Sequence, residues 1–123
     1  MSPNRIPTVV FVDDEINILE VYQHLFTDFD IELKTFKSPE AAVSFINQNL
    51  IDLCFFDYKM PQMSGAELRN KISKSIPCYL VTGLIDINIS GFEGVIPKPF
   101  YLNDFIKVLK HHHLIDIKPE VSI

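Results

Sequence analysis

Apolar residues along this 123-residue chain fall into short runs with two different periodicities. Continuous or alternating runs rich in β-branched and aromatic residues predict five strands. The predicted strands are residues 8–12, 31–36, 53–56, 78–81 and 95–96. The runs 53–56 and 78–81 contain no polar alternation, which is expected for strands covered on both faces of a sheet.

Between these runs, apolar positions recur every three or four residues, which predicts helices. Ser38 before Pro39 offers an N-cap with proline at the first helical position, and Ser64 with Glu67 matches the capping-box pattern. The predicted helices are 16–29, a second from residue 39, a third from 64 to about 74, and a last one after Pro99. Strand and helix alternate nearly throughout, so we expect a single domain with a parallel sheet and helices on both faces.

The composition of the chain argues against several classes of protein. The net charge is −5, the pI is near 5.2, and the eleven basic residues are dispersed, which argues against a nucleic-acid-binding surface. The chain has no apolar stretch of about twenty residues for a membrane span and opens with no signal peptide, so we expect a cytoplasmic protein. Cys54 and Cys78 lie inside strand-like runs and are interpreted as small buried hydrophobes, not as a disulfide.

Polar residues gather where the predicted strands end. Carboxyl ends of parallel strands meet in one crevice. This brings together Asp13, Asp14, Asp57, Thr82 and Lys98. Clustered carboxylates repel one another, and an oxygen-liganded Mg²⁺ would relieve that repulsion. A lysine ammonium and a threonine hydroxyl suit a phosphoryl group. Taken singly, each residue could be a helix cap, a turn former or a surface charge, but these interpretations give no reason for the convergence.

The ordered set resembles the receiver domain of two-component response regulators over Thr8 to about His111. The motifs are the acid pair in VDDE, the aspartate in FFDYKMP followed by Gly65, the threonine in LVTG and the lysine in KPF. The resemblance implies a doubly wound five-stranded parallel sheet of the flavodoxin or CheY type, with strand order 2-1-3-4-5. It also implies a receiver domain at residues 1–113, followed by a tail at 114–123 that is too short for an output domain.

The resemblance further implies roles for the strand-end residues. Asp57 looks like the phosphoacceptor, with Thr82 and Lys98 holding phosphoryl oxygens. Implied ligands of Mg²⁺ are Asp13 (through a water), Asp14, Asp57 and the backbone carbonyl of Lys59. The Lys98–Pro99 peptide is similar to the family's cis bond. The implied partners are a sensor histidine kinase or phosphotransfer protein and an output protein of unknown identity, with neither nucleic acid nor membrane.

Two features depart from the family pattern. Val95 stands where receiver domains usually carry an aromatic switch residue. The segment from Gly83 to Gly94 must supply both loops and the fourth helix, yet it holds three glycines and little helical periodicity. Such a segment sustains about one or two turns, so we expect a shortened or missing fourth helix. Pro97 fits an edge strand because proline cannot donate a ladder hydrogen bond.

Three hypotheses follow. The first is a stand-alone receiver domain whose only chemistry is Mg²⁺-dependent self-phosphotransfer and slow autodephosphorylation. The second is a binding module with the same fold that acts without phosphorylation. The third is an aspartyl-phosphate phosphohydrolase, which would need an acid two residues after the nucleophile, where this chain has Lys59.

Overall fold

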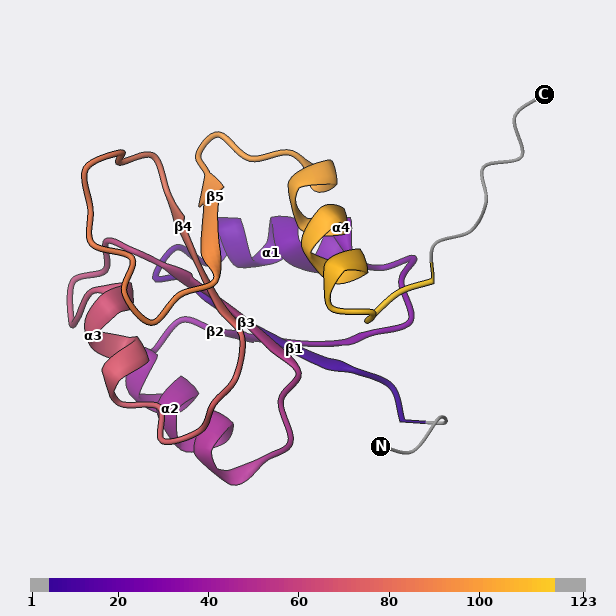
Figure 1. The fold of residues 1–123 in the computed structure, drawn as a ribbon, viewed down its shortest axis with the longest axis horizontal. Helices are drawn as coiled ribbons and strands as arrows, with labels where there is room; N and C mark the ends of the chain where they lie inside the picture. Colours follow the sequence, from indigo (N-terminus) through magenta and orange to yellow (C-terminus); the bar gives the residue numbers. More distant parts are fainter. Residues whose placement is uncertain (1–4, 117–123) are drawn as a thin grey trace.

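A five-stranded parallel sheet forms the centre of the molecule, which a computed structural model describes for residues 5–116 (Figure 1). Its strands are β1 (Thr8–Val12), β2 (Glu32–Phe36), β3 (Leu53–Asp57), β4 (Cys78–Thr82) and β5 (Gly94–Pro97). They lie in the order β2-β1-β3-β4-β5, and every neighbouring pair is parallel. The predicted fold class and strand order are therefore confirmed.

Helices cover both faces of the sheet (Figure 1). Successive strand residues point to opposite faces, which divides the core into two clusters. Phe11 and Phe55 pack with α1 (Ile16–Leu25) and α4 (Leu102–His111) on one face. Val10, Val12 and Phe56 pack with α2 (Pro39–Gln48) and α3 (Gly65–Asn70) on the other. Both faces of the central strands are thus buried, as their unbroken apolar runs predict.

Two helices end earlier than their periodicity predicts. Helix α1 ends at Leu25, not at residue 29, and α3 ends at Asn70, not near residue 74. Beyond each end the chain continues in turns with hydrogen bonds from residue i to residue i−3, such as Phe29 to Phe26 and Ile72 to Arg69. Phe29 and Ile72 still reach the core from these turns, so the apolar spacing outlasts the helix.

No helix connects β4 to β5, since residues 83–93 form only turns and irregular backbone. The fourth helix of the predicted order is therefore missing, as the glycine content suggests. The connection is still anchored, because Phe92 packs edge-on against Phe56 and the Arg69 Nε donates to the Gly91 carbonyl at 3.1 Å. Gly91 has a φ of +88°, a backbone conformation that favours glycine.

Strand β5 is an edge of the sheet, as predicted for the strand that holds Pro97. Pro97 faces Thr82 in the register but has no N–H, and the next residue, Lys98, donates its N–H to the Thr82 carbonyl at 3.0 Å. The Lys98–Pro99 peptide bond is cis, as the resemblance implies. The chain leaves β5 with Lys98 held beside the end of β4.

Cys54 and Cys78 are free, buried neighbours on β3 and β4. Leu114 and Ile115 of the predicted tail pack against the core cluster that includes α4, while residues 117–123 of that tail lie outside the described residues. Within residues 5–116, every helix is too short or too polar to cross a bilayer.

Candidate functional site

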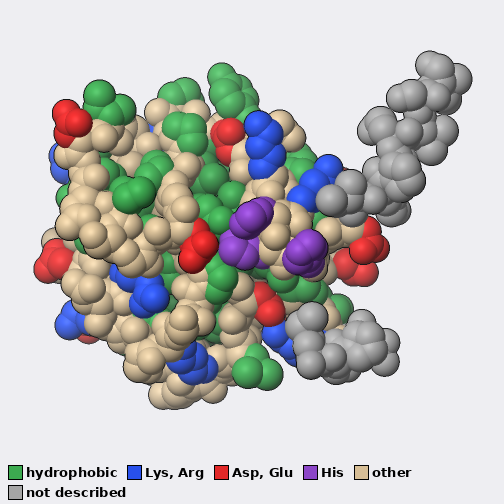
Figure 2. Space-filling view, in the orientation of Figure 1, with side chains coloured by type: hydrophobic (Ala, Val, Ile, Leu, Met, Phe, Trp, Pro, Cys, Tyr) green, Lys and Arg blue, Asp and Glu red, His purple; other side chains and the backbone are tan. Residues whose placement is uncertain are grey.

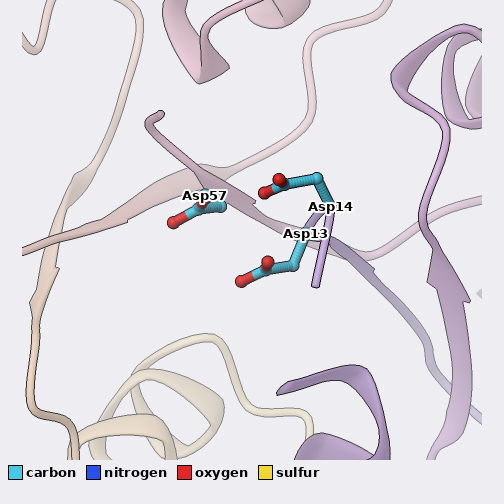
Figure 3. Close-up of side chains that lie close together, drawn as sticks. All are labelled: Asp13, Asp14 and Asp57. Atoms are coloured by element: carbon cyan, nitrogen blue, oxygen red, sulfur yellow. The ribbon is translucent and has the colours of Figure 1, made fainter. Parts of the chain in front are cut away.

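Three carboxylates meet at the carboxyl edge of the sheet (Figure 3). Asp57 is the last residue of β3, and Asp13 and Asp14 directly follow β1. Because Val12 of β1 and Phe56 of β3 are register partners, the residues that follow them emerge side by side. One oxygen from each of the three carboxylates lies within 4.8 Å of the other two.

Asp13 is the most deeply placed of the three and is fully buried. Its Oδ1 accepts a hydrogen bond from the Glu15 backbone N–H at 2.9 Å, whereas its Oδ2 has no hydrogen-bond partner among the described residues. Burial, together with the negative charge of Asp57, raises the pKa of Asp13 to about 6 despite the Glu15 bond. A buried carboxylate oxygen without a partner is costly, so this position suits a bound cation.

Lys98 supplies the one ammonium that reaches the cluster among the described residues. Its Nζ donates to Asp57 Oδ1 at 2.6 Å and lies 4.0 Å from Asp13 Oδ2. Burial raises the pKa of Asp57 even though this bond opposes the shift. Burial lowers the pKa of Lys98, but the bond and the charge of Asp57 outweigh it and the net shift is upward. One ammonium cannot neutralise three carboxylates, which leaves room for a divalent cation.

Thr82, the last residue of β4, stands buried at the same edge. Its hydroxyl accepts a hydrogen bond from the Leu84 N–H at 3.1 Å and keeps its proton for another acceptor. Of the five predicted side chains, Asp13, Asp14, Asp57 and Lys98 therefore come together, and Thr82 ends the neighbouring strand at the same edge. Lys59 follows two residues after Asp57 with an exposed side chain, and the metal-binding role of its carbonyl stays a prediction.

Gly65 closes the loop that follows Asp57. Its N–H donates to the Tyr58 carbonyl at 2.8 Å. A Cβ at this position would lie 2.7 Å from the Asp57 carbonyl oxygen and 2.8 Å from Leu80 Cδ2, both closer than real contacts allow. From the sequence, Gly65 is recognised only as part of a motif. The structure gives the physical reason for a glycine here, because the start of α3 packs so closely against the end of β3 that a Cβ does not fit.

A comparison with protein families finds one that has this sheet order and acidic cluster. The response regulator receiver domain model matches residues 9–110. The chain belongs to this family. The two departures noted in the sequence, Val95 and the missing helix, lie inside the matched range and do not prevent the match.

Curated relatives place the receiver domain in larger proteins. The chain is 32% identical over 89 residues to the cyclic di-GMP phosphodiesterase response regulator RpfG of Xanthomonas campestris, covering 71% of this chain and 23% of that protein. It is 27% identical over 127 residues to the heme response regulator HssR of Staphylococcus saprophyticus, covering 94% of this chain and 57% of that protein. The chain thus spans 23% to 57% of the length of these relatives.

Solved structures show the same fold. A signal receiver domain of an HD domain-containing protein from Pseudomonas fluorescens superposes with a TM-score of 0.80 at 24% identity, covering 92% of this chain and 93% of that chain. A CheY-like receiver domain protein from Methanospirillum hungatei superposes with a TM-score of 0.78 at 23% identity, covering 87% and 93%. At these identities the likeness concerns the fold alone.

Proposed function

We propose that this receiver domain accepts a phosphoryl group on Asp57 from the phosphohistidine of a sensor histidine kinase or phosphotransfer protein. The observation that carries the proposal is the Asp57 carboxylate itself, which lies among two further carboxylates with the Lys98 ammonium 2.6 Å away. A purely structural domain has no need for buried like charges at one strand edge.

The transfer is a displacement at phosphorus. An Asp57 carboxylate oxygen attacks the phosphorus, the bond from phosphorus to the histidine nitrogen breaks, and the imidazole leaves with the bonding electron pair. Lys98 and Thr82 then bind phosphoryl oxygens. Lys98 binds through its positive charge, and the Thr82 hydroxyl donates a hydrogen bond. No water takes part in this step. The Asp57 side chain is buried, and the hydrogen bond from Lys98 holds its carboxylate in position.

Mg²⁺ fits the same residues. Asp14, Asp57 and the Lys59 carbonyl would hold it directly, with Asp13 acting through a water, and the unpartnered Oδ2 of Asp13 is the feature that supports this assignment. When bound, Mg²⁺ neutralises negative charge on the transferring group. Mg²⁺-dependent self-phosphotransfer and slow hydrolysis of the aspartyl phosphate are the only chemistry that we assign.

The output would run through contacts with another protein. We assign residues 1–113 to the receiver domain and 114–123 to a tail, and we expect the protein to act in the cytoplasm, bound to neither nucleic acid nor membrane. A receiver-like module that binds partners without phosphorylation is the second candidate, favoured by Val95 at the switch position and by the missing helix between β4 and β5.

Phosphorylation can be tested with a small phosphodonor. Wild type and Asp57→Asn are incubated with acetyl phosphate, with and without MgCl₂, and the intact mass is measured. We expect one added phosphoryl group in wild type only, and only with Mg²⁺. Asp28→Asn serves as the matched control, because Asp28 is an exposed aspartate outside the cluster and should leave the labelling unchanged.

Two results would decide against the proposal. One is equal labelling of wild type and Asp57→Asn, which would place the modification elsewhere. The other is the absence of labelling in wild type combined with unchanged intrinsic fluorescence of its tyrosines on adding beryllofluoride. That combination would favour the binding module, provided that a partner binds wild type and Asp57→Asn with equal affinity.

A further inference from the structure

An apolar hollow opens beside the phosphorylation site, where the helix between β4 and β5 is missing. Its volume is about 620 Å³. Leu84, Ile85, Ile89 and Val95 line it, and each of these side chains is more than a third exposed, with Ile85 at 92%. Figure 2 shows hydrophobic side chains gathered over the part of the surface where the β4–β5 connection runs.

The small side chain at position 95 helps to keep the hollow open. Ile96 belongs to the core cluster on the α1 and α4 face, so its neighbour Val95 points to the opposite face of β5, toward the connection. Val95 is 37% exposed there. An aromatic ring at this position would occupy part of the same space, and no helix covers it in residues 83–93.

The hollow is continuous with the phosphoryl-binding end of the site. Thr82 and Lys98 line it. The Lys98 Nζ lies 2.6 Å from Asp57 Oδ1, and Thr82 directly follows Val81, the register partner of Asp57. Among residues 5–116, no acidic side chain lines the hollow. It therefore offers a hydroxyl and an ammonium at one end and aliphatic surface beyond them, which is complementary to a molecule with an anionic head and an apolar tail.

We propose that the hollow is an acyl-binding subsite, and that it makes acyl phosphates with aliphatic chains longer than acetyl preferred direct phosphodonors for Asp57. This inference rests on the proposed function. In the reaction, an Asp57 oxygen attacks the phosphorus, the bond from phosphorus to the acyl oxygen breaks, and a carboxylate anion leaves with that electron pair. No proton, oxidant or reductant is needed, and the products are aspartyl phosphate and the free carboxylate.

The size of the preference follows from the buried chain. An acetyl group has only a methyl to offer, whereas butyryl adds two methylenes that can contact Leu84, Ile85 and Val95. Each fully buried methylene corresponds to a factor of about four in an equilibrium or rate constant. Because the hollow is open to solvent, we expect butyryl phosphate to label Asp57 between about three and ten times faster than acetyl phosphate.

The test measures the ratio of second-order rate constants for butyryl and acetyl phosphate in MgCl₂, followed by intact mass. The rates of spontaneous hydrolysis of both donors at neutral pH, in which the same bond from phosphorus to the acyl oxygen breaks, correct for their intrinsic reactivities. Val95→Phe fills the hollow and Ile85→Ser removes an apolar wall that is almost fully exposed. Both variants should bring the ratio toward one. Leu50→Ser is the matched control, since Leu50 is 71% exposed and does not line the hollow, and it should keep the wild-type ratio.

The outcomes separate this inference from the proposed function. A corrected ratio near one in wild type, with acetyl phosphate still labelling Asp57, overturns the subsite and leaves the phosphoacceptor role intact. A raised ratio that persists in both Val95→Phe and Ile85→Ser also overturns it, because the preference would then arise elsewhere. Failure of both donors to label wild type counts against the phosphoacceptor role and removes the basis of the subsite with it.

Discussion

Two regions at the same edge of the sheet differ in how tightly they are built. Around Asp57, the side chains are buried and closely spaced, and a glycine is required where α3 meets the end of β3. In residues 83–93, which follow the neighbouring strand, large aliphatic side chains are exposed and a single glycine has a positive φ. Both regions follow buried strands, so the strands alone do not explain the difference.

The contrast is consistent with the function that we propose for the Asp57 region. Phosphoryl transfer needs oxygens and an ammonium fixed within hydrogen-bond reach, and a small displacement weakens it. The connection between β4 and β5 carries no such geometric requirement beyond its start at Thr82. It can therefore lack a helix, with Phe92 and Arg69 holding it against the sheet, while the carboxylate cluster next to it is kept.

The largest effect on the free energy of unfolding is expected from adding a methyl group in the closely packed region, at Gly65. In Gly65→Ala the new Cβ meets a backbone oxygen at 2.7 Å, which cannot move without displacing Asp57. We expect a loss of about 3 kcal/mol in the free energy of unfolding, the upper part of the range for overpacking. Urea denaturation measures it. Gly83→Ala, whose Cβ would approach the Lys98 carbonyl only to 3.3 Å, should lose clearly less, and equal losses would show that the two ends are packed alike.

Removing the buried charge of Asp13 should increase the free energy of unfolding, the opposite of the effect expected for Gly65→Ala. Because burial raises the pKa of Asp13 from 3.8 to about 6, the folded state binds more protons than the unfolded state between these values, and stability without Mg²⁺ falls as the pH rises from about 4 to 6. Asp13→Asn should therefore stabilise the metal-free protein at pH 7 by on the order of 2 kcal/mol.

Thermal unfolding at pH 4 and pH 7 checks this expectation. The gain from Asp13→Asn should be small at pH 4, and MgCl₂ at pH 7 should stabilise wild type more than the variant. Asp28→Asn, at an exposed site, controls for the loss of one negative charge from an acidic protein. Destabilisation by Asp13→Asn at pH 7 without Mg²⁺ would contradict the electrostatic account.

A hydrogen bond outside both regions should have an intermediate effect on the free energy of unfolding. The Tyr79 hydroxyl on β4 lies 2.8 Å from His112 Nε2 at the C-cap of α4. Tyr79→Phe keeps the ring and removes this bond, so we expect a loss of about 1 kcal/mol by urea denaturation. His112→Gln should lose a similar amount, and the double variant should lose less than the sum. Additive losses would mean that the two side chains do not act as a pair.

The smallest effect is expected in the connection. Ile85 is 92% exposed, so Ile85→Ser should change the free energy of unfolding by less than about 0.5 kcal/mol. Urea denaturation of the same preparation used for the phosphodonor comparison gives this value. A loss comparable to that of Gly65→Ala would show that the connection is structurally as demanding as the site.

Local signals fixed much of the fold. The unbroken apolar runs of β3 and β4 identify buried parallel strands, and Ser38 and Ser64 mark helix starts where their hydroxyls do accept backbone N–H groups. Glycine content predicted that no full helix would follow β4. Helix ends were predicted less well, since Phe29 and Ile72 bury apolar side chains from turns, and a spacing pattern cannot distinguish those from a helix.

The sequence by itself determined which chemical groups stand at the strand ends, because strand lengths and polar residues are encoded locally. Only the tertiary structure decided what those groups do to one another. The unpartnered oxygen of Asp13, the upward shift of its pKa, the bond from Lys98 to Asp57 and the space denied to a Cβ at Gly65 all depend on residues distant in the chain. Burial and charge proximity are properties of packed neighbours, and a single chain position does not carry them.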